Sequence, residues 1–150
     1  MVSVHVWQLA RVAQSLLPAA LRVAQSSPHN PPRAHVLPLK HRLTSPTDFA
    51  KTTKSGVRVG NGNYFLYLLH EESTQDPRAG LIISKVVGGS VARHKVSRAI
   101  RHALAPEISK LKPGTLVVVR ALAGARTAQA LIEIPALLKK AESKYLQAAR

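Results

Sequence analysis

The pattern of hydrophobic and polar residues along the chain first predicts a short helix and then one or two strands. The segment SPTDFAKTTKSG predicts a short helix, because Ser45 or Thr44 can cap its start, Pro46 suits its first position and Gly56 can end it. VRVGNGNYFLYLLH contains apolar and aromatic strand formers around a Gly-Asn-Gly break, which predicts one or two antiparallel strands. The polar stretch EESTQDPR then predicts a loop.

Strand and helix alternate again after this loop. AGLIISKVV is rich in branched apolar residues and predicts a strand, which GGS separates from a helix with many basic residues. KLKPGTLVVVRAL predicts a Pro-Gly turn and another strand, and Thr127 to Ala149 predict a final helix despite Pro135. The order helix, strand, strand, strand, helix, strand, helix predicts an α/β chain, built as an α+β two-layer sandwich around a single small mixed sheet.

The first thirty-five residues differ in character from the rest. Met1 to Ala34 carry three arginines and no acidic residue, and their apolar patches alternate with Gln and Ser before a break at SSPHNPP. This composition is typical of a mitochondrial transit peptide, and a dispensable or mis-assigned extension has the same features. We therefore expect an extension over residues 1–35, disordered or mis-assigned, and a single domain over residues 36–150, which is an ordinary size for one domain.

The overall charge of the chain indicates a class of binding partner. The chain of 150 residues has a formal net charge of +15, and such an excess attracts polyanions, with nucleic acid as the leading class. A membrane surface is the competing polyanion, but no run of about 18 apolar residues occurs. The absence of cysteine excludes a disulfide, a thiolate nucleophile and a cysteine zinc site, and an intracellular location fits best.

The basic charge is concentrated on the predicted helix within GGSVARHKVSRAIRHAL. No acidic residue occurs from Pro77 to Pro106, and on a helical wheel the apolar residues around Val96 and Ile100 fall opposite a broad cationic arc. Solvated helix faces usually mix charges, because like charges at i,i+3 and i,i+4 repel. The pattern therefore favours a face that binds a polyanion.

Catalytic side chains are harder to find. The seven acidic residues form no evident metal-binding cluster, and the seven histidines include no H-E-x-x-H spacing. A protein nuclease built on carboxylates and two metal ions is therefore disfavoured. A helix-turn-helix DNA-binding protein is disfavoured as well, because a strand, IISKVV, occupies the place of the preceding helix.

The run RAGLIISKVVGGSVARHKVSRAIRHAL resembles the signature of the protein subunit of bacterial ribonuclease P, R-x-G-x-x-x-S-K-x-x-G-N-A-V-x-R-N-x-x-K-R-x-x-R. The matching positions are Arg78, Gly80, Ser84, Lys85, Gly88, Val91, Arg93, Arg98 and Arg101. Upstream, HRLTSPTDFAKTTKSG is similar to the family's R-L-x-x-x-x-D-F start, with Arg42, Leu43, Asp48 and Phe49 in register. The resemblance covers the chain from about Val36 to its C-terminus.

The resemblance implies a protein that assists a catalytic RNA in removing the 5′ leader of precursor tRNA. The catalytic groups would belong to the RNA subunit, which would hold most of the Mg²⁺, and the protein alone would bind none. It also implies a left-handed crossover between parallel strands, a cytoplasmic location in a bacterium, and no membrane or small-molecule substrate. An organellar location follows instead if residues 1–35 are a transit peptide.

The resemblance also assigns residues to two binding surfaces. The residues expected to bind the RNA subunit are Lys85, Arg93, His94, Lys95, Arg98 and Arg101. The residues expected to bind the leader are Phe49, Tyr67 and Arg42, because aromatic faces stack on unpaired bases of any sequence.

Four positions depart from the family pattern and keep other functions open. Gly89, Ser90, His94 and Ser97 stand where the family has Asn, Ala, Asn and Lys, so the central basic element loses one cation. A non-catalytic structural or ribosomal-type RNA-binding protein would show the same charge and layout. A diverged, inactive paralogue is the other alternative.

Overall fold

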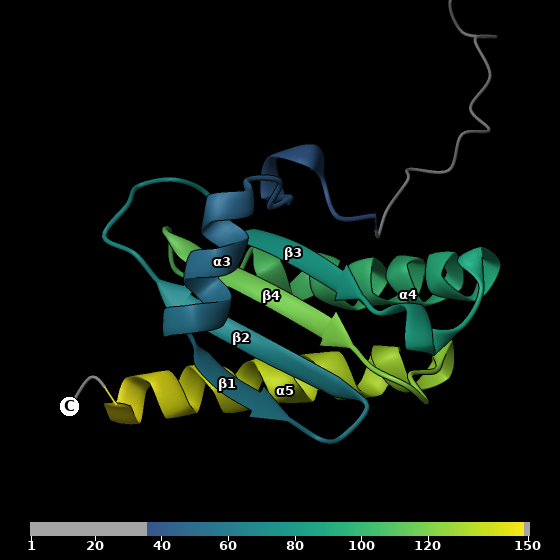
Figure 1. Ribbon diagram of the computed structural model, residues 1–150. Helices are drawn as coiled ribbons and strands as arrows, with labels where there is room; N and C mark the ends of the chain where they lie inside the picture. Colours follow the sequence, from purple (N-terminus) through teal and green to yellow (C-terminus); the bar gives the residue numbers. More distant parts are fainter. Residues whose placement is uncertain (1–35, 149–150) are drawn as a thin grey trace, which may run out of the picture. The chain divides into compact units, whose positions relative to one another are not determined.

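The computed structural model of the chain describes residues 36–148, and the extension predicted over residues 1–35 lies outside them. The predicted order of helices and strands is confirmed (Figure 1). The elements are the short 3-10 helix η2 (Leu39–His41), α3 (Pro46–Ser55), β1 (Val57–Gly60), β2 (Tyr64–His70), β3 (Arg78–Ile83), the 3-10 helix η3 (Lys85–Val87), α4 (Ser90–Ile108), β4 (Thr115–Ala121) and α5 (Thr127–Ala148).

The four strands form one mixed sheet in the order β1-β2-β4-β3. β2 pairs antiparallel with both β1 and β4, whereas β3 pairs parallel with β4 from Arg78↔Leu116 to Ile83↔Ala121. The predicted mixed sheet and α+β class are therefore confirmed. The hairpin between β1 and β2 turns through Gly62, whose φ of 100° suits glycine.

α4 connects the two parallel strands by a left-handed crossover. In Figure 1, β3 and β4 run in the same direction, α4 returns behind the sheet, and β4 lies on the β2 side of β3. Nearly all such connections are right-handed. The expectation taken from the resemblance is confirmed here against the general rule.

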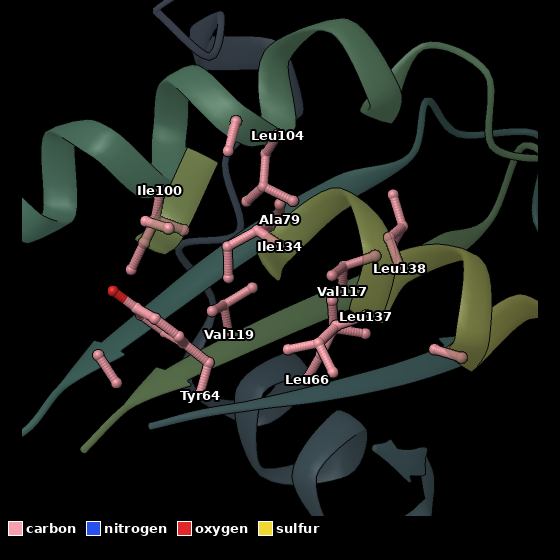
Figure 2. Close-up of a cluster of buried hydrophobic side chains, with 14 of the residues drawn as sticks. Tyr64, Leu66, Ala79, Ile100, Leu104, Val117, Val119, Ile134, Leu137 and Leu138 are labelled. Atoms are coloured by element: carbon pink, nitrogen blue, oxygen red, sulfur yellow. The ribbon is translucent and has the colours of Figure 1, made fainter. Parts of the chain in front are cut away.

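The main core lies between the sheet and the pair α4 and α5. Figure 2 shows side chains from the sheet and from both helices meeting there, with Leu66 and Val119 from the sheet facing Ile100 of α4 and Ile134 of α5. All four of these side chains are fully buried. Because alternate residues of a strand point to opposite faces, the neighbouring residues of β2 and β4 face α3 on the other side of the sheet.

One predicted strand is shorter than expected. AGLIISKVV was expected to be extended throughout, but β3 ends at Ile83 and Lys85–Val87 form η3. The physical reason is the length of β4, whose last residue Ala121 pairs with Ile83, so the following residues have no strand beside them. The chain turns there through Gly88, at a φ of 137°.

Candidate nucleic-acid interface

α4 carries a basic face on the side away from the core. Its buried residues are Val96, Ala99, Ile100, Ala103, Leu104 and Ile108. His94, Lys95 and Arg98 are exposed, and Arg93 and Arg101 are partly buried. We define these five residues and the exposed Lys85, which lies in η3 just before α4, as the basic face. The amphipathic pattern predicted for this helix is confirmed.

No carboxylate neutralises the basic face within residues 36–148. All seven acidic residues lie in this part of the chain, yet the only ion pair that involves α4 joins Glu107 to Lys110 at 2.9 Å, near the end of the helix. Like charges spaced three or four residues apart on a helix repel. The basic face therefore suits a ligand that brings several negative charges.

Hollows adjoin the basic face, and two of them bear on its chemistry. One, of about 520 Å³, lies between α4 and the first turns of α5 and is lined by Lys95, Arg98, Ala99, His102, Thr127 and Leu131. The other, of about 240 Å³, is lined by Ile83, Ser90, Arg93, His94 and Ser97. The Nε atom of Arg93 is buried and has no hydrogen-bond partner among the described residues. The small side chain of Ser97 leaves room beside this arginine.

Arg42 lies on the α4 side of the sheet. Its backbone forms a parallel bridge with Ala79, which belongs to the main core, and its Nε donates a 3.0 Å hydrogen bond to the carbonyl oxygen of Leu37. Burial, and to a smaller degree the charge of Arg42, lower the pKa of Arg101. Arg42 therefore extends the basic face, and the structure does not bring it together with the two predicted aromatic residues.

Phe49 and Tyr67 lie together on the opposite face of the sheet, under α3. Both belong to a smaller apolar cluster with Leu116 and Val118, which α3 covers in Figure 1. Tyr67 is 8% exposed, whereas Phe49 is only partly buried. Of these two aromatic residues, Phe49 thus offers more surface to a ligand.

Polar contacts hold α3 in place over this face. The Ser45 side chain caps the helix by accepting a 3.4 Å hydrogen bond from the amide of Asp48, as the sequence predicts. The Asp48 carboxylate lies 3.3 Å from the guanidinium of Arg78 on β3. Lys51 contacts Glu71 at 2.6 Å, and the hydrogen bond and charge of Glu71 raise the pKa of Lys51. These contacts fix Phe49 relative to the sheet.

Sequence reasoning missed three residues on the α3 face of the sheet. Phe65 of β2 packs against the apolar cluster that contains Tyr67. Strand register places Arg58 of β1 opposite Tyr67 and Arg120 of β4 opposite Phe65, so both arginines share this face. Arg120 is the one exposed position of β4. The signal available in the sequence was Arg120, a lone basic residue in the apolar run LVVVRA. Only the pairing of β4 with β2 places it on the same face as Phe65 and Arg58.

Two further structural findings bear on the predicted classes. Within residues 36–148, no helix is both long and apolar enough to cross a membrane. In the same part of the chain, no group of three or more histidine, aspartate or glutamate side chains could hold a metal ion.

Comparison with known proteins finds a protein family that matches most of the chain. The family model described as Ribonuclease P matches residues 37–142. The chain is 43% identical over 95 residues to the ribonuclease P protein component of Mycolicibacterium vanbaalenii, which covers 62% of this chain and 80% of the relative. It is 36% identical over 113 residues to that of Mycobacterium sp. strain KMS, covering 73% of this chain and 96% of the relative.

Solved structures resemble the fold described above. The RNase P protein of Staphylococcus aureus is similar with a TM-score of 0.61 at 28% identity, over 67% of this chain and 94% of the other. The RNase P protein of Thermotoga maritima has a TM-score of 0.56 at 19% identity, over 66% of this chain and 96% of the other, and supports the fold alone.

Proposed function

The chain belongs to the family of bacterial ribonuclease P protein components, and from this premise we propose that its basic face binds the RNA subunit of the enzyme. As such a component it is part of an endoribonuclease and assists in removing the 5′ leader of precursor tRNA. The residues proposed to contact the RNA subunit are Lys85, Arg93, His94, Lys95, Arg98 and Arg101.

The uncompensated charge of α4 is the observation that carries this proposal. Phosphates of a folded RNA would relieve the repulsion among the basic side chains and would release counterions, which makes binding steeply dependent on salt. His94 can donate a hydrogen bond to a phosphate or a base in place of the family's Asn. Arg42, beside Arg101, would add a further cation at the edge of the same surface.

The face of the sheet under α3 is the proposed path of the precursor leader. Phe49 is partly exposed there and can stack on an unpaired base, while the nearly buried Tyr67 would mainly support the cluster on which Phe49 packs. Stacking accepts every base, which suits leaders of many sequences. Arg42 lies on the other side of the sheet, so it would meet the leader only near the edge of β3.

The protein's contribution would be electrostatic and positional. We propose that the RNA subunit holds most of the Mg²⁺, which supplies the chemistry of phosphodiester cleavage, because carboxylates are too scattered over residues 36–148 to form a metal site. The chain's own residues would orient the RNA and the leader relative to each other. A bacterial cytoplasm, where precursor tRNA is made, is the compartment that fits this work.

Cleavage of a precursor tRNA by a bacterial ribonuclease P RNA at low magnesium tests the proposal. The full chain should strongly raise the rate of leader removal, whereas a lysine-rich peptide of the same net charge should not. Tight, salt-sensitive RNA binding without stimulation of cleavage would reject the proposed function and favour a structural RNA-binding protein. A chain that neither binds nor stimulates would reject both.

A further inference from the structure

Arg58 and Phe65 form a stacked pair on the open part of the sheet face. The guanidinium carbon of Arg58 lies 4.0 Å from the centroid of the Phe65 ring, within the range of a cation–π interaction. The residue opposite Phe65 on β1 is Gly60, and a β-carbon at Gly60 would collide with the Phe65 ring. The missing side chain therefore lets the ring lie close over β1, where Arg58 can cover it.

Arg120 stands next to this pair on the neighbouring strand. It is the register partner of Phe65 on β4, and its other neighbour is Ile82 on β3. Residues directly opposite in a sheet point to the same side, so Arg120 and Phe65 share the face that α3 covers in part. The two strands that flank Phe65 on β2 therefore each carry an arginine on this face, Arg58 on β1 and Arg120 on β4.

Neither arginine has a carboxylate partner within residues 36–148, where all seven acidic residues lie. Both are exposed, and Phe65 is partly exposed. An arginine that is stacked on a ring keeps its guanidinium plane oriented and its N–H donors free. This differs from an ordinary solvated arginine, whose side chain samples many rotamers.

We propose that Arg58, Phe65 and Arg120 together bind one unpaired nucleotide of the precursor leader, a site additional to that of Phe49. The base stacks on the outer face of the Arg58 guanidinium, which the Phe65 ring supports from below, and Arg120 contacts an adjacent phosphate. This inference rests on the proposed function, because it takes the single-stranded leader as its ligand.

The position of the site agrees with the proposed path. Phe65 lies two residues before Tyr67 on β2, so both aromatic side chains are on one face of the same strand. The site lies at the end of the sheet where β3 and β4 terminate and where α4 begins (Figure 1). An RNA strand that runs from Phe49 across this end of the sheet would therefore approach the first turn of α4.

The test measures the affinity of a holoenzyme that contains the full chain for three RNAs, with calcium in place of magnesium to prevent cleavage. The RNAs are a precursor tRNA, the same tRNA without a leader, and the precursor with abasic leader positions. Arg58→Gln, Phe65→Leu and Arg120→Gln are compared with Lys140→Gln, which removes an exposed charge from α5. Thermal unfolding checks that each variant folds.

Each of the three site variants should weaken binding of the precursor about tenfold and leave binding of the leaderless tRNA unchanged. Lys140→Gln should match the wild type on all three RNAs. On the abasic leader, Arg58→Gln and Phe65→Leu should no longer differ from the wild type, whereas Arg120→Gln should remain weaker.

The outcomes separate this site from the proposed function. A wild-type holoenzyme that prefers the precursor, combined with site variants that keep this preference, overturns the site alone. Equal losses on precursor and leaderless tRNA also overturn it, because they indicate general charge attraction. A wild-type chain that neither stimulates cleavage nor prefers the precursor overturns the proposed function, and the site with it.

Discussion

The ring of Phe49 on α3 lies against Gly80 on β3, in the space that a β-carbon of Gly80 would occupy. The contact joins the helix to the sheet at the centre of the proposed leader path. Leu43 borders the same space, so the ring cannot shift freely toward it.

Gly80→Ala should therefore lower the free energy of unfolding by about 1–3 kcal/mol, because an inserted methyl group forces the Phe49 ring and α3 away from the sheet. Urea unfolding measures this loss. Phe49→Leu should relieve part of it, so the double variant should be more stable than the sum of the single effects. Additive losses would show that the two residues do not compete for space.

Tyr64→Phe should reduce the loss of folding stability that occurs at high pH. The fully buried Tyr64 donates a 2.9 Å hydrogen bond to the carbonyl oxygen of Arg126, and burial, followed by the charge of Glu133, raises the pKa of Tyr64 to about 12. An unfolded tyrosine has a pKa of about 10, so between about pH 10 and 12 the unfolded chain loses this proton while the folded chain keeps it.

The stability that the neutral Tyr64 contributes is thus fully present below about pH 10 and is lost as the pH rises toward 12. Urea unfolding at about pH 8 and about pH 11 should show a larger loss for the wild type than for Tyr64→Phe. At neutral pH the variant should be less stable by about 1 kcal/mol, from the lost hydrogen bond. Equal pH dependence in the two proteins would contradict the raised pKa.

Arg98→Ala combined with Arg101→Ala should weaken binding to the RNA subunit and make the dependence of log K on log salt shallower by about 1–2 units. Each lost phosphate contact removes part of the counterion release. Lys139→Ala with Lys140→Ala removes the same charge from exposed positions on α5 and is the matched control. If both double variants change the slope equally, net charge rather than the basic face governs binding.

Removal of residues 1–35 should leave RNA binding and stimulation of cleavage nearly intact. The family match begins at residue 37, so every residue proposed to contact RNA is retained. Filter binding and the low-magnesium cleavage assay, carried out on the full chain and the shortened chain together, measure the difference. A loss of tenfold or more would make the extension a working part of the protein.

Local signals in the sequence were sufficient for most of the elements. Ser45, Pro46 and Gly56 mark both ends of α3, and the apolar spacing around Val96 and Ile100 predicts the buried side of α4. These signals work because capping and amphipathicity depend on residues only a few positions apart. The end of β3 was mispredicted because it is set by Ala121, its distant partner on β4.

The binding surfaces were less accessible to sequence reasoning. Tyr67 lies in YFLYLL, where both faces are apolar, and both faces of β2 are indeed covered, so alternation alone could not decide its side. Arg42 was grouped with Phe49 on resemblance, but its bridge to Ala79 turns it toward α4. Arg58 and Phe65 became a pair only through the register of β1 with β2.

The left-handed crossover gives α4 two functions, one in binding and one in the fold. The helix that would hold the RNA is also the segment that ties β3 to β4, so the surface for the partner cannot loosen without the sheet loosening too. A ligand that binds only the folded form shifts the folding equilibrium toward that form in proportion to its free concentration. If the basic face binds as proposed, the RNA subunit therefore raises the free energy of unfolding of the protein to which it binds.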